Sequence, residues 1–373
     1  MIIRFDPEGT VTGFCDILNR VLETKSVEGV FVLACDANGF GAENLKEVLK
    51  KVPVPIWGGI FPAIIHGKEK HEKGTIVIGL FKKPIVRVIP NLSDSQVDYE
   101  KLISAGLPDH DAIKTMFVLV DGFAKRINAL IESMFNVFGL EVNYLGGGAG
   151  SMTMVQKPCL ITNNGLLADS AILAMLDMQS GIGVCHGWQT IGGPFKVTES
   201  DRNTIRSLDW KPAFEVYRAV VEEHAGRQFT QENFFDLAKC YPFGISKLGA
   251  EKIVRDPFMR EDSGALVCVG EVPQESFVHI LSGDVNALVG AASNARAMAE
   301  QSFPNTSLAR VGFFMDCISR VLFLQNEFSR ELDAVYHEQW PLVGALTIGE
   351  IANNGKEYLE FYNKTAVVGL LEA

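Results

Sequence analysis

The feature that most constrains the fold is a unit that recurs three times along the 373-residue sequence. Each copy has a short apolar strand ending in aspartate, an amphipathic helix, a second strand that enters a glycine-rich turn, and one further strand. The copies start with the apolar runs at residues 30–36, 116–121 and 311–316. Alternating strands and helices are typical of sheets covered by helices. We therefore predict an α/β (mixed α+β) fold, with a ligand site near the aspartates at the strand ends.

Two of the copies also resemble each other residue by residue. Aligned without gaps, residues 55–65 and 341–351 share the proline at the first position, the glycine at the fourth and the isoleucine at the last. Any two segments that pass from a strand into a turn can share a proline and a glycine by chance. Duplication and chance similarity therefore stay open as alternatives.

A different pattern separates the second copy from the third. Residues 181–203 alternate between apolar and polar side chains and contain a Ser-Asp-Arg-Asn turn, which is typical of a β-hairpin. A helix is expected after Pro212, and residues 265–269 and 276–281 read as further strands. We expect a two-part architecture with a β-hairpin-rich insertion, and we place the domains at residues 1–165 and 166–373.

Composition narrows the class of protein. The net charge is −11 and no run of five Lys or Arg occurs, so nucleic acid is not an expected partner. No stretch approaches the ~20 apolar residues of a membrane helix, and the N-terminus lacks a secretory pattern, so we expect a cytoplasmic protein without membrane insertion. The seven cysteines are scattered and never spaced as C-x-x-C, which argues against disulfides and a metal site.

No cofactor is expected either. Residues 146–151, Gly-Gly-Gly-Ala-Gly-Ser, could present backbone N–H groups to a phosphate. They lack the Lys-Ser/Thr pair of a P-loop and the spacing of a dinucleotide fingerprint. A tight structural turn is the favoured interpretation of this segment.

An ordered set of short motifs resembles the FIST family, the F-box and intracellular signal transduction proteins. The motifs are His186-Gly187-Trp188, Tyr241-Pro242-Phe243-Gly244, Val254-Arg255-Asp256, Asp316-Cys317-Ile318-Ser319-Arg320, Gly349-Glu350-Ile351 and Asn363-Lys364-Thr365. The resemblance implies a FIST-N-like domain over residues 1–165, a FIST-C-like domain over residues 166–373, and a sensory function that binds small ligands such as amino acids. The family's Gly-Glu turn is absent at Gly58-Gly59, and Ser319 replaces a glycine of the family pattern.

Binding a zwitterion requires a cationic fork for its carboxylate and an anion for its ammonium group. Arg320 and Glu350 can supply these groups, and the alternative is a structural ion pair between the two. The full set of predicted ligand-binding residues is Arg320, Glu350, Cys317, Asp316, Arg255, Trp188, Asn363 and Thr365.

Three functions remain in competition. The leading hypothesis is a non-enzymatic sensor of amino acids or small carboxylates that signals in trans to a separate signalling protein. The second is a thiol-dependent hydrolase or transferase that uses Cys317, because a thiol near a helix N-terminus can act as a nucleophile. The third is a protein-interaction scaffold without a ligand, which predicts an exposed apolar patch and no pocket at the strand ends.

Overall fold

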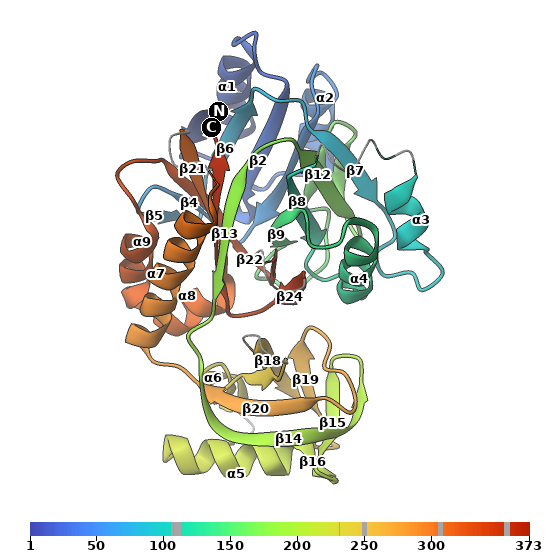
Figure 1. Ribbon diagram of the computed structural model, residues 1–373, viewed down its shortest axis with the longest axis vertical. Coiled ribbons are helices and arrows are strands. Elements are labelled where there is room, and N and C mark those ends of the chain that lie inside the picture. The colour runs from blue at the N-terminus through green and yellow to red at the C-terminus, as the bar shows by residue number, and fades with distance from the viewer. Residues whose placement is uncertain (106, 108–112, 231, 248–251, 305–308, 354–358) are drawn as a thin grey trace.

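The computed structural model describes residues 1–105, 107, 113–230, 232–247, 252–304, 309–353 and 359–373. Three six-stranded mixed sheets form a body, and a small closed β-barrel lies beyond one end of it (Figure 1). The predicted α/β class and the β-hairpin-rich insertion are both confirmed. Within the described residues, no helix has the length and apolar character needed to cross a membrane.

The body consists of three units with the same order of elements. The first unit contains β1 (Ile2–Asp6), α1 (Val11–Leu22), β2 (Gly29–Cys35), α2 (Ala42–Leu49), β3 (Ile56–Phe61), β4 (Ala63–His66), β5 (Glu69–His71) and β6 (Thr75–Leu80). The second contains β7 (Ile85–Ile89), α3 (Tyr99–Ser104), β8 (Thr115–Asp121), α4 (Ile127–Phe138), β9 (Asn143–Ala149), β10 (Leu160–Thr162), β11 (Gly165–Leu167) and β12 (Ala171–Leu176). The third contains β13 (Ser180–Cys185), α7 (Val285–Ser302), β21 (Arg310–Cys317), α8 (Ile318–Leu324), α9 (Phe328–Val335), β22 (Leu342–Thr347), β23 (Glu350–Ala352), β24 (Glu360–Tyr362) and β25 (Ala366–Glu372).

The three units exchange their hairpins. The sheet orders are β1-β6-β2-β3-β10-β11, β7-β12-β8-β9-β23-β24 and β13-β25-β21-β22-β4-β5. Each sheet therefore takes four strands from one unit and a two-stranded hairpin from another. Within each unit the strands before and after the crossover helix pair in parallel, as β2 with β3, β8 with β9, and β21 with β22. The exchange ties each sheet to the next through backbone hydrogen bonds.

One phenylalanine from each unit lies where the three sheets meet. Phe31, Phe117 and Phe313 occupy the same register position in β2, β8 and β21, opposite Trp57, Leu145 and Val343. Their ring centroids lie 4.9 Å, 5.2 Å and 6.2 Å apart. Contacts at this range pack the three sheets around one shared apolar core.

Glycine follows at the next register position of the partner strands, at residues 58, 146 and 344. A Cβ atom at these positions would lie only 2.1, 1.8 and 1.9 Å from a carbonyl oxygen of the neighbouring strand. The alignment of residues 55–65 with 341–351 places two of these glycines together, as the structure does. Duplication of the sequence itself stays a prediction.

The register corrects two expectations. Asp36, Asp121 and Asp316 lie five, four and three residues after their phenylalanines, so these aspartates do not occupy equivalent positions. The Gly-rich segment from residue 146 is not a turn, because residues 143–149 form β9. Its glycines allow close packing: Gly148 and Gly349 are joined by a backbone hydrogen bond of 2.8 Å.

The barrel is inserted between β13 and α7 of the third unit. It contains β14 (Gln189–Asp201), β15 (Thr204–Leu208), β16 (Lys211–Pro212), α5 (Ala213–Ala225), α6 (Phe234–Ala238), β17 (Phe243–Ile245), β18 (Ile253–Arg260), β19 (Leu266–Val269) and β20 (Phe277–Ser282). Antiparallel pairs in the order β14-β20-β17-β18-β19-β15 close on β14. The boundary expected at residue 165 falls inside β11, which pairs with β10, whereas these strands delimit the barrel at residues 189–282.

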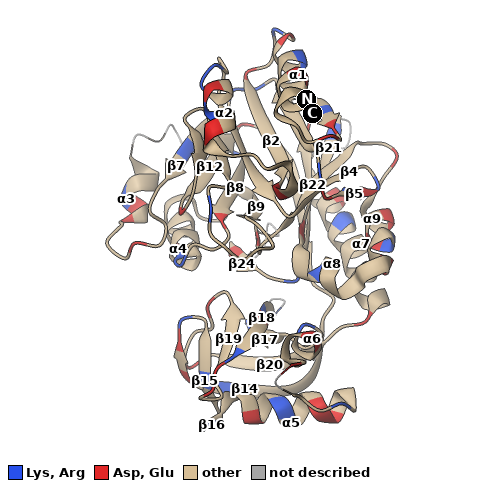
Figure 2. Cartoon of the chain, turned by 180° about the vertical axis from the view of Figure 1, so that it is seen from behind, with Lys and Arg blue, Asp and Glu red and all other residues tan. Residues whose placement is uncertain are grey.

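Charged side chains of both signs share the exposed helices. Lys and Arg lie among Asp and Glu along α2 and α5, as seen from behind in Figure 2. Such mixed faces differ from the basic stripe that nucleic-acid binding requires.

Candidate ligand site at the junction of body and barrel

Arg320 lies at the centre of a buried polar network that joins the body to the barrel. It stands on the first turn of α8, and its side chain is fully buried. Its Nε atom donates to Oε1 of Glu331 at 2.9 Å and lies 3.3 Å from Oδ1 of Asp316. Its remaining donors reach the carbonyl oxygens of His186 at 2.7 Å, Leu288 at 2.9 Å and Lys364 at 3.2 Å. The guanidinium is therefore saturated by groups of the protein itself.

Glu350 begins β23 and is also fully buried. Its carboxylate accepts hydrogen bonds from the Thr347 hydroxyl at 2.7 Å and from the Thr365 backbone at 3.3 Å. Burial raises the pKa of Glu350 to about 8, although hydrogen bonds from Thr347 and Cys317 act in the opposite direction. Within the described residues, the ion-pair partners of Arg320 are Asp316 and Glu331, so the alternative of a direct Arg320–Glu350 pair is wrong.

Lys364 extends the network into the barrel. Its side chain is fully buried, and its Nζ atom donates to the Lys239 carbonyl at 2.8 Å and lies 3.1 Å from Asp256 on β18. The same ammonium lies 5.0 Å from the ring centroid of Trp188, whose Nε1 donates to the Lys364 carbonyl at 3.1 Å. Trp188 thus has a cation–π contact and a hydrogen bond with one residue.

Arg255 connects this network to the barrel wall. Its Nε donates to the Glu271 carbonyl at 2.8 Å, and its Nη1 donates to the Phe361 carbonyl at 3.0 Å and to Oδ1 of Asn363 at 3.4 Å. Gly270 leaves room for this guanidinium, because a Cβ there would lie 3.0 Å from the Arg255 Nε. Burial lowers the pKa of Arg255 to about 10. Through its hydrogen bond to the Glu271 carbonyl, the Arg255 side chain holds the Gly270-Glu271 turn in place.

The structure therefore gathers all eight predicted ligand-binding residues into one buried region, where most of their polar contacts are with other groups of the protein, such as Glu331 and Lys364. Thr365 completes the set through a hydrogen bond from its hydroxyl to the Asn363 carbonyl at 2.8 Å. Three cations, Arg255, Arg320 and Lys364, lie among four carboxyl groups. The carboxyl groups are those of Asp256, Asp316, Glu331 and Glu350. Their contact with a ligand stays a prediction.

Cys317 caps the N-terminus of α8, as the thiol hypothesis requires, but its surroundings do not favour a thiolate. The side chain is buried, and burial together with the Glu350 carboxylate raises the pKa of the thiol. Burial and Arg320 lower the pKa of His186 to about 3, which leaves the imidazole neutral. A nucleophilic cysteine requires the opposite shift.

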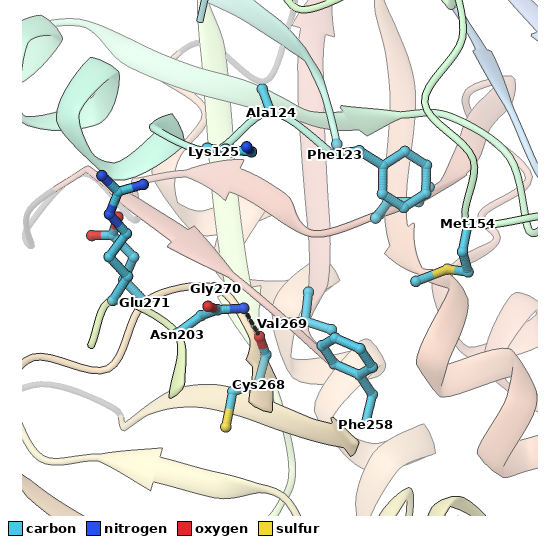
Figure 3. Close-up of a pocket in the computed structure, with 13 residues that line it drawn as sticks. Phe123, Ala124, Lys125, Met154, Asn203, Phe258, Cys268, Val269, Gly270 and Glu271 are labelled. Atoms are coloured by element: carbon cyan, nitrogen blue, oxygen red, sulfur yellow. Dashed lines mark hydrogen bonds between the residues drawn. The ribbon is translucent and has the colours of Figure 1, made fainter. Parts of the chain in front are cut away.

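A cavity of about 380 Å³ opens beside the network, between body and barrel. Its body wall is the turn after β8, residues 122–125, with Met154 and with Ile348, which follows β22. Its barrel wall is the β14–β15 hairpin tip, Phe258 and residues 268–271. Figure 3 shows Phe123 and Lys125 above this space and Asn203, Cys268 and Phe258 below it. The cavity lies at the carboxyl ends of β8 and β22, the edge where the sequence predicts binding.

Three charged residues of this cavity belong to none of the family motifs, and they were not identified as candidate site residues from the sequence. They are Lys125 on the body wall and Arg202 and Glu271 on the barrel wall. Arg202 lies at the predicted Ser-Asp-Arg-Asn turn, and its φ of 52° fits a tight hairpin tip. That turn was the only available signal, because a single surface charge has no periodicity that marks it as functional.

A second cavity of about 270 Å³ shares Glu271 with the first and lies between α4 and the barrel. Its two cations, Lys247 and Arg255, already have partners. Lys247 forms an ion pair with Glu360 at 2.6 Å, and Arg255 donates to the carbonyls described above. The first cavity is therefore the better candidate for a charged ligand.

Residues 30–211 match the FIST N domain, and residues 213–353 match the FIST C domain. No curated protein matches the chain. FIST domains are sensory domains of signal transduction. The two matches follow one another along most of the sequence, and the chain belongs to the FIST family.

Proposed function

We propose that this protein is a non-enzymatic sensor that binds an amino acid or a small carboxylate and signals in trans to a separate protein. The single observation that carries the proposal is the cavity of about 380 Å³ between the turn after β8 and the barrel. A volume of this size suits a small metabolite, since ligand pockets typically measure about 300–1,000 Å³.

The lining of the cavity supports this class of ligand. Phe123, Phe258 and Ile348 provide apolar surface, while Lys125 and Glu271 provide one cation and one anion. A zwitterion carries both charges and a small body, so it matches this combination. The apolar residues exclude water around the ligand and strengthen its ionic contacts.

The buried network has a supporting role in this proposal. Arg255 holds the Glu271 carbonyl from behind, and Arg320 ties the β13–β14 connection, α7 and the β24–β25 loop together through three carbonyls. Rigid walls reduce the entropic cost of binding. The residues that resemble the family motifs therefore position the cavity, and the ligand contacts come from Lys125, Glu271 and their neighbours.

A thermal-shift panel of amino acids and small carboxylates tests binding. A ligand present at 100 times its dissociation constant stabilises the folded protein by about 2.7 kcal/mol, which raises the melting temperature measurably. The variant Val269→Trp fills the cavity from its barrel wall and should abolish the shift.

The matched control is Ala297→Trp, which introduces the same side chain on the exposed face of α7, outside the cavity. It should keep the shift of the wild-type protein. The proposal fails if no compound in the panel raises the melting temperature, or if Val269→Trp folds and binds as well as Ala297→Trp.

Signalling in trans requires that ligand binding in the cavity change the surface that the protein presents to its partner. Met154 lines the cavity and is 56% exposed, and the adjacent Val155 is 62% exposed. A ligand that contacts Met154 from inside would alter this apolar segment, which a partner protein can read. Hydrogen exchange of residues 151–157 should slow when the ligand is added. Unchanged exchange under saturating ligand would exclude this segment as the output.

A further inference from the structure

We infer that the cavity selects a ligand with two carboxylates and one ammonium group, that is, an acidic amino acid held between Lys125 and Arg202. This inference rests on the proposed function and specifies its ligand. The observation behind it is the presence, on opposite walls of one cavity, of two cations that form no ion pair with any residue in the described part of the chain.

Within the described residues, neither the Lys125 ammonium nor the Arg202 guanidinium forms an ion pair at 4 Å or less. By contrast, Arg206, four residues further along the same hairpin, lies 3.3 Å from Glu199. In a chain of net charge −11, these two cations and Glu271 give the lining of this cavity a net charge of +1, which an anion can balance.

Both cations stand on backbone that the protein holds in place. The Lys125 N–H donates to the Ser93 hydroxyl at 3.0 Å, and the Phe123 N–H donates to Oδ1 of Asp121 at 3.1 Å. On the barrel, the Arg202 carbonyl accepts from the Val272 N–H at 2.8 Å. Two fixed attachment points on two separate walls favour a ligand with two acidic groups over one with a single carboxylate.

Glu271 is the only acidic residue among those that line this cavity in the described structure. Its Oε2 atom accepts from Asn128 at 3.3 Å, which orients the carboxylate. With a dicarboxylate on the two cations, this group provides the site for a positive charge. The three charges together match an α-amino acid whose side chain ends in a second carboxylate.

Isothermal titration calorimetry with matched ligands tests the inference. L-Glutamate and L-aspartate should bind, whereas L-glutamine and L-asparagine, which lack the second carboxylate, should bind about 10- to 100-fold more weakly, since each is short of one charge-assisted contact. Glutarate and succinate, which lack the ammonium group, should be weakened to a similar degree.

Two variants locate the contacts. Lys125→Met and Arg202→Gln should each weaken L-glutamate binding at least tenfold. One of the two cations binds the side-chain carboxylate of the ligand. In the variant that lacks this cation, glutamate and glutamine should bind almost equally. Arg206→Gln is the matched control, because it removes a guanidinium of the same hairpin outside this cavity and should leave both affinities unchanged.

The outcomes are distinguishable. If neutral amino acids bind as tightly as acidic ones, or if both variants keep the wild-type preference, the inference is wrong while the proposed sensor function stands. If no amino acid or carboxylate binds the wild-type protein, the proposed function fails as well. Loss of the preference in one variant and not in Arg206→Gln supports the assignment.

Discussion

The Nε atom of Arg320 lies 2.9 Å from Oε1 of Glu331, and both side chains are fully buried. Arg320 lies on the first turn of α8 and Glu331 lies on the buried face of α9. The pair fixes the angle between two short helices at the junction with the barrel. Although burial disfavours the charged form of Arg320, the carboxylates of Glu331 and Asp316 raise its pKa, which keeps the guanidinium charged.

The first prediction concerns this pair. Arg320→Met leaves Glu331 and Asp316 buried without their cation, and we expect it to lower the free energy of unfolding by about 3–5 kcal/mol. Arg330→Met is the control, because Arg330, on the same helix as Glu331, forms an exposed pair at 2.9 Å with Glu327, the residue before that helix. That change should cost less than about 1 kcal/mol. Urea denaturation measures both, and equal losses would contradict a structural role for Arg320.

The second prediction concerns pH. Burial raises the pKa of Glu350 from its ordinary value near 4.5 to about 8 in the folded protein. The folded state therefore binds a proton that the unfolded state releases, and this contribution to stability is lost as pH rises through that window, at up to about 1.4 kcal/mol per pH unit. Glu350→Gln should remove this slope between pH 5 and 8. The free energy of unfolding is measured by denaturation at a series of pH values. If it falls equally with pH in the wild-type protein and the variant, Glu350 is not the titrating group.

The third prediction concerns close packing. Gly146→Ala places a Cβ 1.8 Å from the Val118 carbonyl oxygen, in the middle of a parallel strand pair. We expect a loss of about 3 kcal/mol or more, because backbone must shift to accept the methyl group. Gly290→Ala, on α7 with nothing within 4 Å of the new Cβ, should stabilise the protein by about 0.5–1 kcal/mol. Thermal denaturation that ranks the two variants in the opposite order would contradict this packing.

The fourth prediction concerns thiol reactivity. Cys317 is 2% exposed and its thiol has a raised pKa, whereas Cys15 is partly exposed on α1. Iodoacetamide should label Cys317 at least about tenfold more slowly than Cys15 at neutral pH, because only an accessible thiolate reacts. Mass spectrometry of timed samples gives both rates. Faster labelling of Cys317 would revive the hypothesis of a thiol-dependent enzyme.

Local periodicity predicted the elements of the fold. Each copy of the repeated unit was expected to contain an amphipathic helix, and in the third copy α9 buries Phe328, Leu332 and Val335 on one face. The Ser-Asp-Arg-Asn turn indicated a hairpin, and it joins β14 to β15. These features follow from side-chain spacing and turn chemistry over a few residues, which is why the sequence by itself determined them.

The partners of distant residues were decided only by the tertiary structure. The β4–β5 hairpin pairs with β22, almost 280 residues away, and Lys125 meets Arg202 across a cavity that neither segment forms alone. Arg320 binds Glu331 and not Glu350, because the helix that follows it turns back across its side chain. Such pairings depend on how whole sheets pack and exchange strands. The spacing of residues along a single strand or helix does not specify these long-range contacts.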